Sequence, residues 1–362
     1  MTSKTRNVDC EHILITGVTG YIGFKTLSIA LTVGYRVRAV VRNEANIKDL
    51  KNRDPTVVES LERGQLHFVV IPDFLVEDAI FNHLDGITVL IHIASPLAIE
   101  TNDYDAGIIK PALSMVTTVL EAAARVSSIR RVVLTSSCVT LVPFEWNMNP
   151  DSDRLYTVAD INTNTTGPFL NAMQAYWASK ALTRLATKEF VRNNCPQFDF
   201  INLLPSVVIG PDDRLNNDPT ATIESLLQGT RAAVLAPALT SSLSSPFPYV
   251  GVPVHVADVA WAHIDAIDAD LVPGNSEYIL CSDTPDGVVW DRDVANIARK
   301  FFQKEVTTKV LPLEGSLTTI KWRLDAQSTE EVFGWKFTSF EDTMKELLAQ
   351  YLELQARNNA VI

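Results

Sequence analysis

The segment NAMQAYWASKALTRLATKEF, residues 171–190, contains a tyrosine and a lysine four residues apart, Tyr176 and Lys180. Its apolar periodicity predicts an amphipathic helix, on which residues at i and i+4 share a face. A tyrosine has an unperturbed pKa of about 10, so it donates a proton more readily at neutral pH when a neighbouring ammonium stabilises the phenolate. The spacing alone proves little, because Tyr176 could pack against a core while Lys180 reaches water.

Two adjacent serines could complete an acid and base site. The motif L-T-S-S-C places Ser136 and Ser137 at the end of the apolar run RRVVLTS. If that run is a strand of a parallel sheet, both hydroxyls lie at the carboxyl edge, where open α/β folds bind ligands. A serine there can polarise a carbonyl oxygen and stabilise a developing alkoxide, with a nicotinamide lying between it and the tyrosine helix.

A glycine-rich turn follows the first apolar run, HILIT. It reads T-G-V-T-G-Y-I-G, with glycines at the spacing G-x-x-G-x-x-G just before a helical pattern. Glycine lets the backbone approach a pyrophosphate, whose charge is met by free N–H groups and the positive end of the helix dipole. Glycines also mark ordinary turns. The strand–turn–helix context nevertheless predicts a dinucleotide site, with cofactor contacts from Gly17, Thr19, Gly20, Tyr21, Ile22 and Gly23.

A basic residue ends the second apolar run. NAD enzymes usually carry an acidic residue there for the ribose 2′-hydroxyl, whereas this chain has Arg42 in VVRNE. A guanidinium can bind a 2′-phosphate and stack on adenine, so NADP(H) is favoured over NAD(H) as cofactor. Lys48 can add charge, while Arg38 lies within the strand and is expected to point elsewhere. A solvated charged loop is the alternative explanation.

Apolar runs alternate with helical patterns in the first half of the chain. Strands are predicted at 12–16, 35–42, 66–71, 88–94, 130–136 and 198–205, and helices at about 21–33 and 104–126, besides the one containing Tyr176. Strands that are apolar on both faces and separated by helices require a parallel sheet covered on both sides. The predicted fold class is therefore α/β, with a doubly wound parallel sheet.

The pattern changes after Pro205. Loop-rich stretches enclose a short helix around 222–228, and residues 252–267 are predicted to form a strand and a helix that return to the main sheet. The last helix is predicted to be amphipathic. Ser339 and Asp342 offer a capping box at its start, and its apolar face consists of Phe340, Met344, Leu347, Leu348 and Tyr351. We infer two domains: residues 1–204 with about 250–272 for the cofactor, and a smaller, discontinuous one, 205–249 with 273–362, for the substrate.

Composition and charge limit the class of protein. The chain has 362 residues, 46% hydrophobic and 20% charged, which suits one large or two medium globular domains and excludes disorder as the main state. A net charge of -12 argues against a general nucleic-acid binder. No histidine or cysteine spacing indicates a metal site, and free thiols are expected for the scattered cysteines, which are Cys10, Cys138, Cys195 and Cys281.

Targeting signals are not evident in the sequence. The N-terminal MTSKTRNVDCEH lacks the apolar stretch of a signal peptide, and no run approaches the ~20 apolar residues that span a bilayer. The C-terminal VI is not a lipidation signal. A cytoplasmic protein without a membrane or nucleic-acid partner is expected, either monomer or homodimer.

Taken together, these motifs resemble the extended short-chain dehydrogenase/reductase family. More closely, they resemble its dihydroflavonol reductase, cinnamoyl-CoA reductase and fungal carbonyl reductase branch. The matching pieces cover most of the chain: TGVTGYIG, VRAVVRN, PDF at 72–74, HIASP at 92–96, IIKPAL at 108–113, LTSS, YWASK, LLPSVVIGP at 203–211 and VPVHVADVAWAH. The resemblance implies a Rossmann-type fold.

The resemblance also implies roles for the reactive side chains. It makes Ser137 the carbonyl-polarising serine, Tyr176 the acid and base, and Lys180 the ribose-binding residue that lowers the tyrosine pKa. Ser137 matches the last serine before the small residue of the family motif, and Ser136 stays the alternative. The resemblance also implies further cofactor contacts. Asp73 and Phe74 would lie beside the adenine, Ala94, Ser95 and Pro96 beside the ribose, and Pro205 to Val208 beside the nicotinamide.

Two positions depart from the family pattern. Thr118 stands where related proteins usually carry an asparagine, which puts an asparagine-organised water and lysine network in doubt. The usual H-V-D-D-V reads H-V-A-D-V at 255–259, which affects a helix cap and leaves Asp258 in the first turn.

These observations lead to a functional expectation. We expect NADPH-dependent reduction of a ketone or aldehyde, with a biosynthetic ketone, an aromatic aldehyde and a flavonoid-like carbonyl all suiting the motifs. An epimerase or dehydratase of the same fold, or a non-catalytic NADP-binding protein, are the alternatives. Trp146, Trp177 and Phe169 either line a substrate pocket with the long 144–169 loop or belong to the core.

Overall fold

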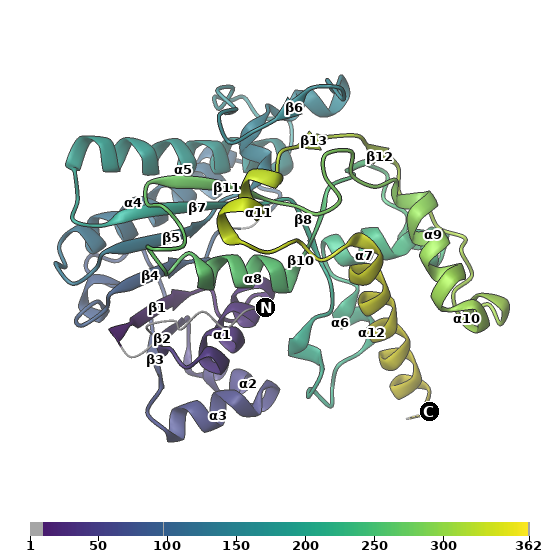
Figure 1. Ribbon diagram of the computed structural model, residues 1–362, viewed down its shortest axis with the longest axis horizontal. Helices are drawn as coiled ribbons and strands as arrows, with labels where there is room; N and C mark the ends of the chain where they lie inside the picture. The colour runs from purple at the N-terminus through teal and green to yellow at the C-terminus, as the bar shows by residue number, and fades with distance from the viewer. Residues whose placement is uncertain (1–9, 97, 361–362) are drawn as a thin grey trace.

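The computed structural model describes residues 10–96 and 98–360, arranged around a seven-stranded parallel sheet (Figure 1). The strand order is β11-β7-β5-β4-β1-β2-β3. The bounds are β1 (His12–Thr16), β2 (Arg36–Val41), β3 (Leu66–Val70), β4 (Val89–His92), β5 (Arg131–Thr135), β7 (Asp199–Pro205) and β11 (Ser276–Leu280). The chain runs outward from β1 in both directions, so a crevice forms between the ends of β1 and β4. The predicted doubly wound fold is confirmed.

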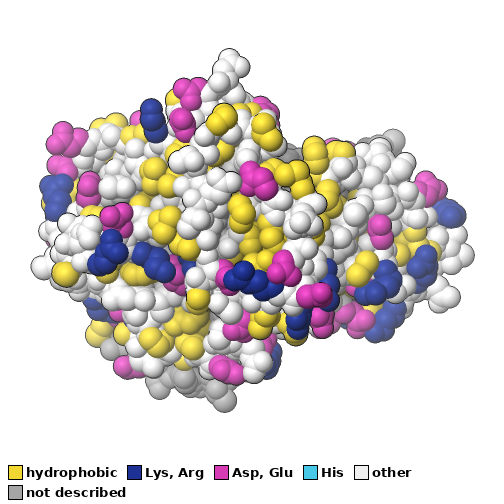
Figure 2. Space-filling view, turned by 90° about the horizontal axis from the view of Figure 1, so that it is seen from above, with side chains coloured by type: hydrophobic (Ala, Val, Ile, Leu, Met, Phe, Trp, Pro, Cys, Tyr) yellow, Lys and Arg dark blue, Asp and Glu magenta, His cyan; other side chains and the backbone are white. Residues whose placement is uncertain are grey.

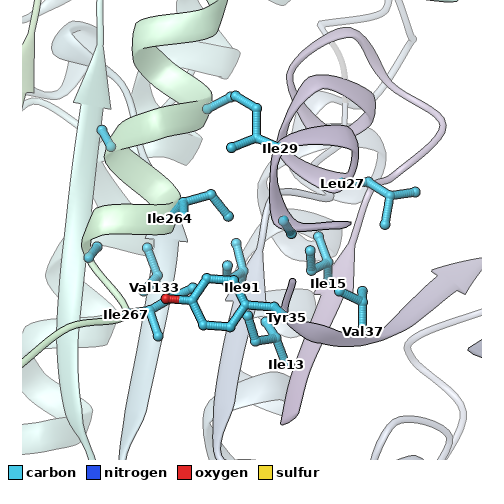
Figure 3. Packing of buried hydrophobic residues seen from close by; sticks show 14 of the residues in the cluster. Ile13, Ile15, Leu27, Ile29, Tyr35, Val37, Ile91, Val133, Ile264 and Ile267 are labelled. Atoms are coloured by element: carbon cyan, nitrogen blue, oxygen red, sulfur yellow. The ribbon is translucent and has the colours of Figure 1, made fainter. Parts of the chain in front are cut away.

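Helices cover both faces of the sheet because alternate strand residues point to opposite sides. Ile13 and Ile15 of β1 pack under α1 (Tyr21–Val33) and α8 (Val256–Asp265), whereas Leu14 packs under α4 (Lys110–Ala124). Figure 3 shows the first of these layers, in which strand residues meet apolar side chains of α1 and of the α8 segment. The long helix α5 (Ala172–Asn194) lies beside α4 on the second face (Figure 1).

The remaining helices lie beside the sheet or in the C-terminal region. On the sheet side they are α2 (Glu44–Arg53), α3 (Pro55–Glu62) and α11 (Gln327–Phe333). The C-terminal region contains α6 (Ile223–Leu226), α7 (Thr230–Leu235), α9 (Trp290–Phe301), α10 (Gln303–Thr307) and α12 (Phe340–Ala360), to the right in Figure 1. Three two-stranded parallel pairs join β6 (Leu155–Tyr156) to β13 (Arg323–Leu324), β8 (Val207–Ile209) to β10 (Pro253–His255), and β9 (Tyr249–Val250) to β12 (Thr319–Ile320).

The last helix has the amphipathic face expected from the sequence. Its five predicted apolar residues are all buried in a second core with α7 and α9. The Ser339 Oγ accepts a hydrogen bond from the Asp342 N–H at 3.1 Å and donates one to the Asp342 carboxylate. Ser339 therefore caps α12 through its hydroxyl, and Asp342 binds that hydroxyl rather than the Ser339 N–H of a full capping box. The buried apolar face packs α12 against the C-terminal region.

Two details of the predicted fold need correction. The strand at 253–255 does not return to the main sheet but pairs with β8. The seventh strand of the main sheet is instead β11, which lies beyond the boundary drawn at 273. The division of the chain into two domains otherwise stays a prediction.

One helical stretch is long and apolar enough to cross a membrane, judged by length and composition only. It spans Asp105–Ala124, with a mean hydropathy of 1.2. The stretch contains Asp105, Lys110 and Glu121, so it is not a continuous run of about 20 apolar residues. Val116, Val119 and Leu120 pack against β4 and β5 in the core, so the stretch occupies the position of a core helix.

Charged side chains of both signs are interspersed over the face of the molecule shown in Figure 2. The chain carries 43 acidic and 31 basic residues, so its average field repels an anion. Any anionic cofactor must therefore be attracted by particular residues and backbone groups at its own site.

Candidate active site

The glycine turn packs so tightly that two of its residues have no room for a side chain. Gly17 has a φ of +77°, and a Cβ there would lie 2.7 Å from the Ala94 nitrogen. A Cβ on Gly23 would lie 2.0 Å from the Gly17 carbonyl oxygen. The turn is thus a backbone cradle in which α1 starts close to the end of β4, and it brings the predicted residues Gly17 and Ala94 together.

The start of α1 is suited to an anion. Gly20 is its N-cap, no side chain caps the helix, and its first turn carries no acidic residue. The N–H groups of the first turn therefore have no intrahelical or side-chain acceptor, and the helix dipole adds partial positive charge. Together with the missing side chains of the turn, this arrangement fits the pyrophosphate of a dinucleotide.

Sequence reasoning missed two arginines that reach this turn from the C-terminal region. Arg214 donates from Nη1 to the carbonyl of Thr19 at 3.1 Å, and the Arg231 guanidinium lies 4.3 Å from the ring centroid of Tyr21. Asp212, buried to 1% exposure, accepts hydrogen bonds from Arg214 and forms ion pairs with both arginines. In the sequence, Arg214 is only a basic residue in GPDDRLNN. Its contact with Thr19 spans 195 residues and therefore cannot be predicted from a local pattern.

The ends of β2 and β3 meet beside the turn. The Ile71 N–H donates to the Val41 carbonyl at 2.8 Å, which brings Arg42 and Asp73 to the same edge of the sheet. Arg42 is exposed and has no ion-pair or hydrogen-bond partner among residues 10–96 and 98–360. Lys48 is exposed on α2. A free guanidinium at this position fits a 2′-phosphate.

Three neighbouring side chains have structural roles in this structure. Arg38 donates to the carbonyls of His83 and Asp85, so it points away from the edge as expected. Asp73 accepts from the Leu75 N–H at 2.8 Å, and Phe74 is buried edge-on against His92. Any adenine contact by Asp73 and Phe74 stays a prediction.

Tyr176 and Lys180 lie together on α5, as their spacing predicts. The Lys180 Nζ is 5.7 Å from the centroid of the Tyr176 ring. Burial raises the pKa of Tyr176 to about 12 and lowers the pKa of Lys180 to about 8. Burial causes both of these shifts, and a lowering of the tyrosine pKa by Lys180 stays a prediction.

The two serines at the end of β5 differ in their surroundings. The Ser136 Oγ is buried without a hydrogen-bond partner and lines a small cavity of about 30 Å³ with Lys180 and His92. The Ser137 Oγ accepts from the Val139 N–H at 3.3 Å and begins a short 3-10 helix over Cys138–Leu141. Ser95 and Pro96 line the same cavity, whereas Tyr176 and Ser137 do not. The choice of Ser137 stays a prediction.

The C-terminal side of the predicted cofactor cleft is formed by the segment after β7. Pro205 ends β7 and is buried, and Val208 lies in β8, where its carbonyl accepts from the Thr230 Oγ1 at 2.8 Å. Contact of Pro205 and Val208 with a nicotinamide stays a prediction.

Three buried histidines, His92, His255 and His263, have structural contacts. Burial lowers the pKa of His92 to about 3, and its Nδ1 lies 2.9 Å from the Thr16 Oγ1. Burial also lowers the pKa of His263 to about 4, and its ring contacts Thr135. His255 caps α8 through Nδ1. Within residues 10–96 and 98–360, no group of three or more His, Cys, Asp or Glu could hold a metal ion.

Contacts in the structure show what Asp258 and the aromatic residues near the 144–169 loop do. Asp258 accepts from the N–H and Oγ1 of Thr338 and so ties α8 to the chain before α12. Trp146 packs in the core against Tyr156, to whose hydroxyl its Nε1 donates at 2.8 Å. Phe169 and Trp177 line a pocket of about 180 Å³ under the 144–169 loop, and Trp177 also packs in the same core cluster as Trp146. The four cysteines are free thiols, as expected.

Comparison with known proteins agrees with this geometry. Residues 13–280 match the model of the NAD dependent epimerase/dehydratase family. The ketoreductase CTB6 of Cercospora nicotianae is 31% identical over 96% of this chain and 97% of its own. A bifunctional dihydroflavonol 4-reductase/flavanone 4-reductase of Malus domestica is 26% identical over 86% and 82%. The yeast methylglyoxal/isovaleraldehyde reductase Gre2, solved with NADPH, superposes with a TM-score of 0.76 at 21% identity, over 96% and 99%. The chain therefore belongs to the NAD dependent epimerase/dehydratase family, within the extended short-chain dehydrogenases/reductases that its motifs predicted.

Proposed function

We propose that this protein reduces a ketone or aldehyde to an alcohol with NADPH. The observation that carries the proposal is the pair on α5, in which a half-buried tyrosine and a buried ammonium lie 5.7 Å apart, measured from Nζ to ring centroid. Support comes from the ketoreductase name of the relative at 31% identity and from the NADPH bound by Gre2. The backbone cradle at Gly17 and Gly23 fits the pyrophosphate of such a cofactor.

Besides hydride, the reduction needs a proton for the product oxygen and groups that stabilise the developing charge, and side chains of this chain supply them. A bound nicotinamide supplies hydride to the carbonyl carbon. The carbonyl oxygen then needs a proton, and Tyr176, whose raised pKa keeps it protonated at neutral pH, donates its hydroxyl proton. Ser137 orients and polarises the oxygen, and the Lys180 ammonium stabilises the phenolate that remains while binding the ribose. The products are an alcohol and a tyrosinate that recovers its proton from solvent.

Arg42 should determine the choice between the two cofactors. Arg42→Ala is expected to weaken NADPH binding by about 10- to 100-fold, the size of a lost charge-assisted contact, while NADH binding changes by less than about threefold. Fluorescence titration with both nucleotides measures the difference. Arg36→Ala, at the opposite end of the same strand, is the matched control. Equal losses for NADPH and NADH would count against a phosphate contact.

Lys180 should impose a pH limit on reduction. Its ammonium is present below a pKa of about 8 and is lost as the pH rises through that value, so kcat for reduction is expected to fall above about pH 8. The phenol titrates higher, at about 12, and contributes nothing to this fall. Lys180→Arg keeps a permanent charge and should remove the decline, even at lower overall activity. An unchanged alkaline limb in that variant would remove Lys180 from this role.

A panel of ketones and aldehydes, followed by loss of NADPH absorbance, tests the proposed reaction. Reduction consumes one NADPH per alcohol formed. An epimerase or dehydratase of this family would convert its substrate without net consumption, and a nucleotide-binding protein would bind NADPH without turnover. Either pattern across the panel would replace the proposal with that alternative.

A further inference from the structure

The long loop before α5 encloses a pocket of about 180 Å³. We call it the Glu145 pocket, and its lining consists of Phe144, Glu145, Asn162, Asn164, Thr166, Gly167, Pro168, Phe169, Gln174 and Trp177. Aromatic rings form part of the wall, with Phe144 edge-on to Trp177 at 5.5 Å between centroids. Amide and carboxylate groups form much of the rest. The pocket thus combines ring faces with hydrogen-bonding groups.

Buried contacts hold this loop in place. The Arg184 side chain, fully buried on α5, donates to the carbonyls of Val158 and Asp160 and forms an ion pair with Glu277. The Asn162 N–H donates to the Thr140 carbonyl at 2.7 Å. Because these bonds tie the loop to α5 and to the segment after β5, the pocket is formed before a ligand arrives.

Glu145 is a fixed carboxylate without a cation. It accepts from the Gln174 Nε2 at 2.5 Å and from the Asn164 Nδ2 at 3.2 Å, so each oxygen is oriented by one amide. Gln174 is itself held, because its Oε1 accepts from the Leu170 N–H. Among the residues that the structure describes, no Lys, Arg or His forms an ion pair with Glu145. Each oxygen retains a lone pair for a donor, and the negative charge is not neutralised.

Asn162 provides an unpaired donor at the same pocket. Its side chain is buried to 2% exposure, and its Oδ1 accepts from the Asn164 N–H at 2.9 Å. Its Nδ2 donates to no other residue within 10–96 and 98–360. This Nδ2 is not among the fully buried side-chain atoms that lack a partner, so it is accessible at the pocket, where it can donate to an acceptor oxygen of a ligand.

The pocket is linked to the proposed proton donor through Trp177. Trp177 lines the pocket, and Tyr176, which does not line it, packs with Phe144 against the same apolar cluster as Trp177. We propose that this pocket receives an uncharged hydroxylated aromatic or cyclic group of the carbonyl substrate. The hydroxyl donates to Glu145 and accepts from Asn162, and the ring lies among the aromatic side chains. An acid at the same position is repelled by Glu145. This inference rests on the proposed reductase activity.

The hydroxyacetophenone isomers and their methoxy and carboxy analogues test this inference. For the wild type, kcat/KM for the best hydroxyl compound is expected to exceed that of its carboxy analogue by at least about tenfold. Glu145→Gln should reduce this ratio to about threefold or less, because it removes the charge and keeps the shape. Asn162→Asp should lower kcat/KM for the hydroxyl compound and leave the methoxy compound less affected. Glu189→Gln, exposed on the same helix, is the matched control.

Binding measured by calorimetry in the presence of NADPH separates this inference from the proposed function. Hydroxyl compounds that bind in a Glu145-dependent manner without turnover would count against the reductase and leave the pocket assignment intact. Reduction of other carbonyls but of no hydroxyacetophenone would overturn the pocket assignment. The pocket assignment also fails if folded Glu145→Gln, with normal NADPH affinity, keeps the wild-type ratio, or if the wild type shows no preference over the acid.

Discussion

Replacing Tyr176 with Phe is expected to lower kcat for carbonyl reduction by a factor of about 10²–10⁴ while leaving NADPH affinity nearly unchanged. The substitution removes only the hydroxyl, and with it the proton that the product oxygen needs. The ring remains to pack beside Lys180, so the helix and its buried cation keep their positions. Single-turnover absorbance measurements with saturating NADPH separate this loss from any change in binding.

A second tyrosine provides the control for that experiment. Tyr104→Phe removes the hydroxyl of a half-buried tyrosine that donates to Glu100, outside the proposed chemistry. It should leave kcat within about twofold of the wild type, because it removes one solvent-exposed hydrogen bond and keeps the ring. A Tyr176→Phe enzyme as active as Tyr104→Phe would show that another group donates the proton.

Gly23→Ala is expected to abolish NADPH binding. The added Cβ would lie 2.0 Å from the Gly17 carbonyl oxygen, a backbone atom that can move only if the turn opens. Opening the turn displaces the N–H groups that meet the pyrophosphate. Because α1 packs in the core, we also expect a lower melting temperature.

Gly20→Ala separates steric damage from a general intolerance of the turn. Its Cβ would lie 3.3 Å from the same oxygen, which a shift of a few tenths of an ångström relieves. Cofactor titration and thermal melting should show a smaller loss for Gly20→Ala than for Gly23→Ala. Normal binding by folded Gly23→Ala would disprove the backbone cradle as the phosphate site.

The main sheet was predictable because most of its strands are apolar on both faces. β11 was missed for the opposite reason: it begins with Ser276 and Glu277, which break the apolar pattern. In the structure the Glu277 carboxylate is neutralised by Arg184 and Lys188 and accepts from Asn202. These partners come from α5 and β7, so tertiary structure makes a strand out of a polar sequence. The run at 252–256 had the better strand pattern but pairs only with β8.

In the candidate site, too, features set by local sequence were predictable and features set by tertiary packing were not. The contact between Tyr176 and Lys180 follows from helix spacing, and the turn at Gly17 follows from its glycines. The rise of the tyrosine pKa on burial did not follow, because burial depends on every element packed around α5. The unpaired Nδ2 of Asn162 likewise depends on the path of a loop that carries no periodic pattern.

The hydrogen bond from Arg214 to Thr19 has a practical consequence for exchanging parts between relatives. Asp212 and Arg231, both almost fully buried, and Arg214 form one cluster of paired charges carried by the C-terminal region. A chimera assembled near this point must inherit all three from a single parent. Splitting them would leave an uncompensated ion in the protein interior, and the hybrid would fail at the junction rather than at its new substrate pocket.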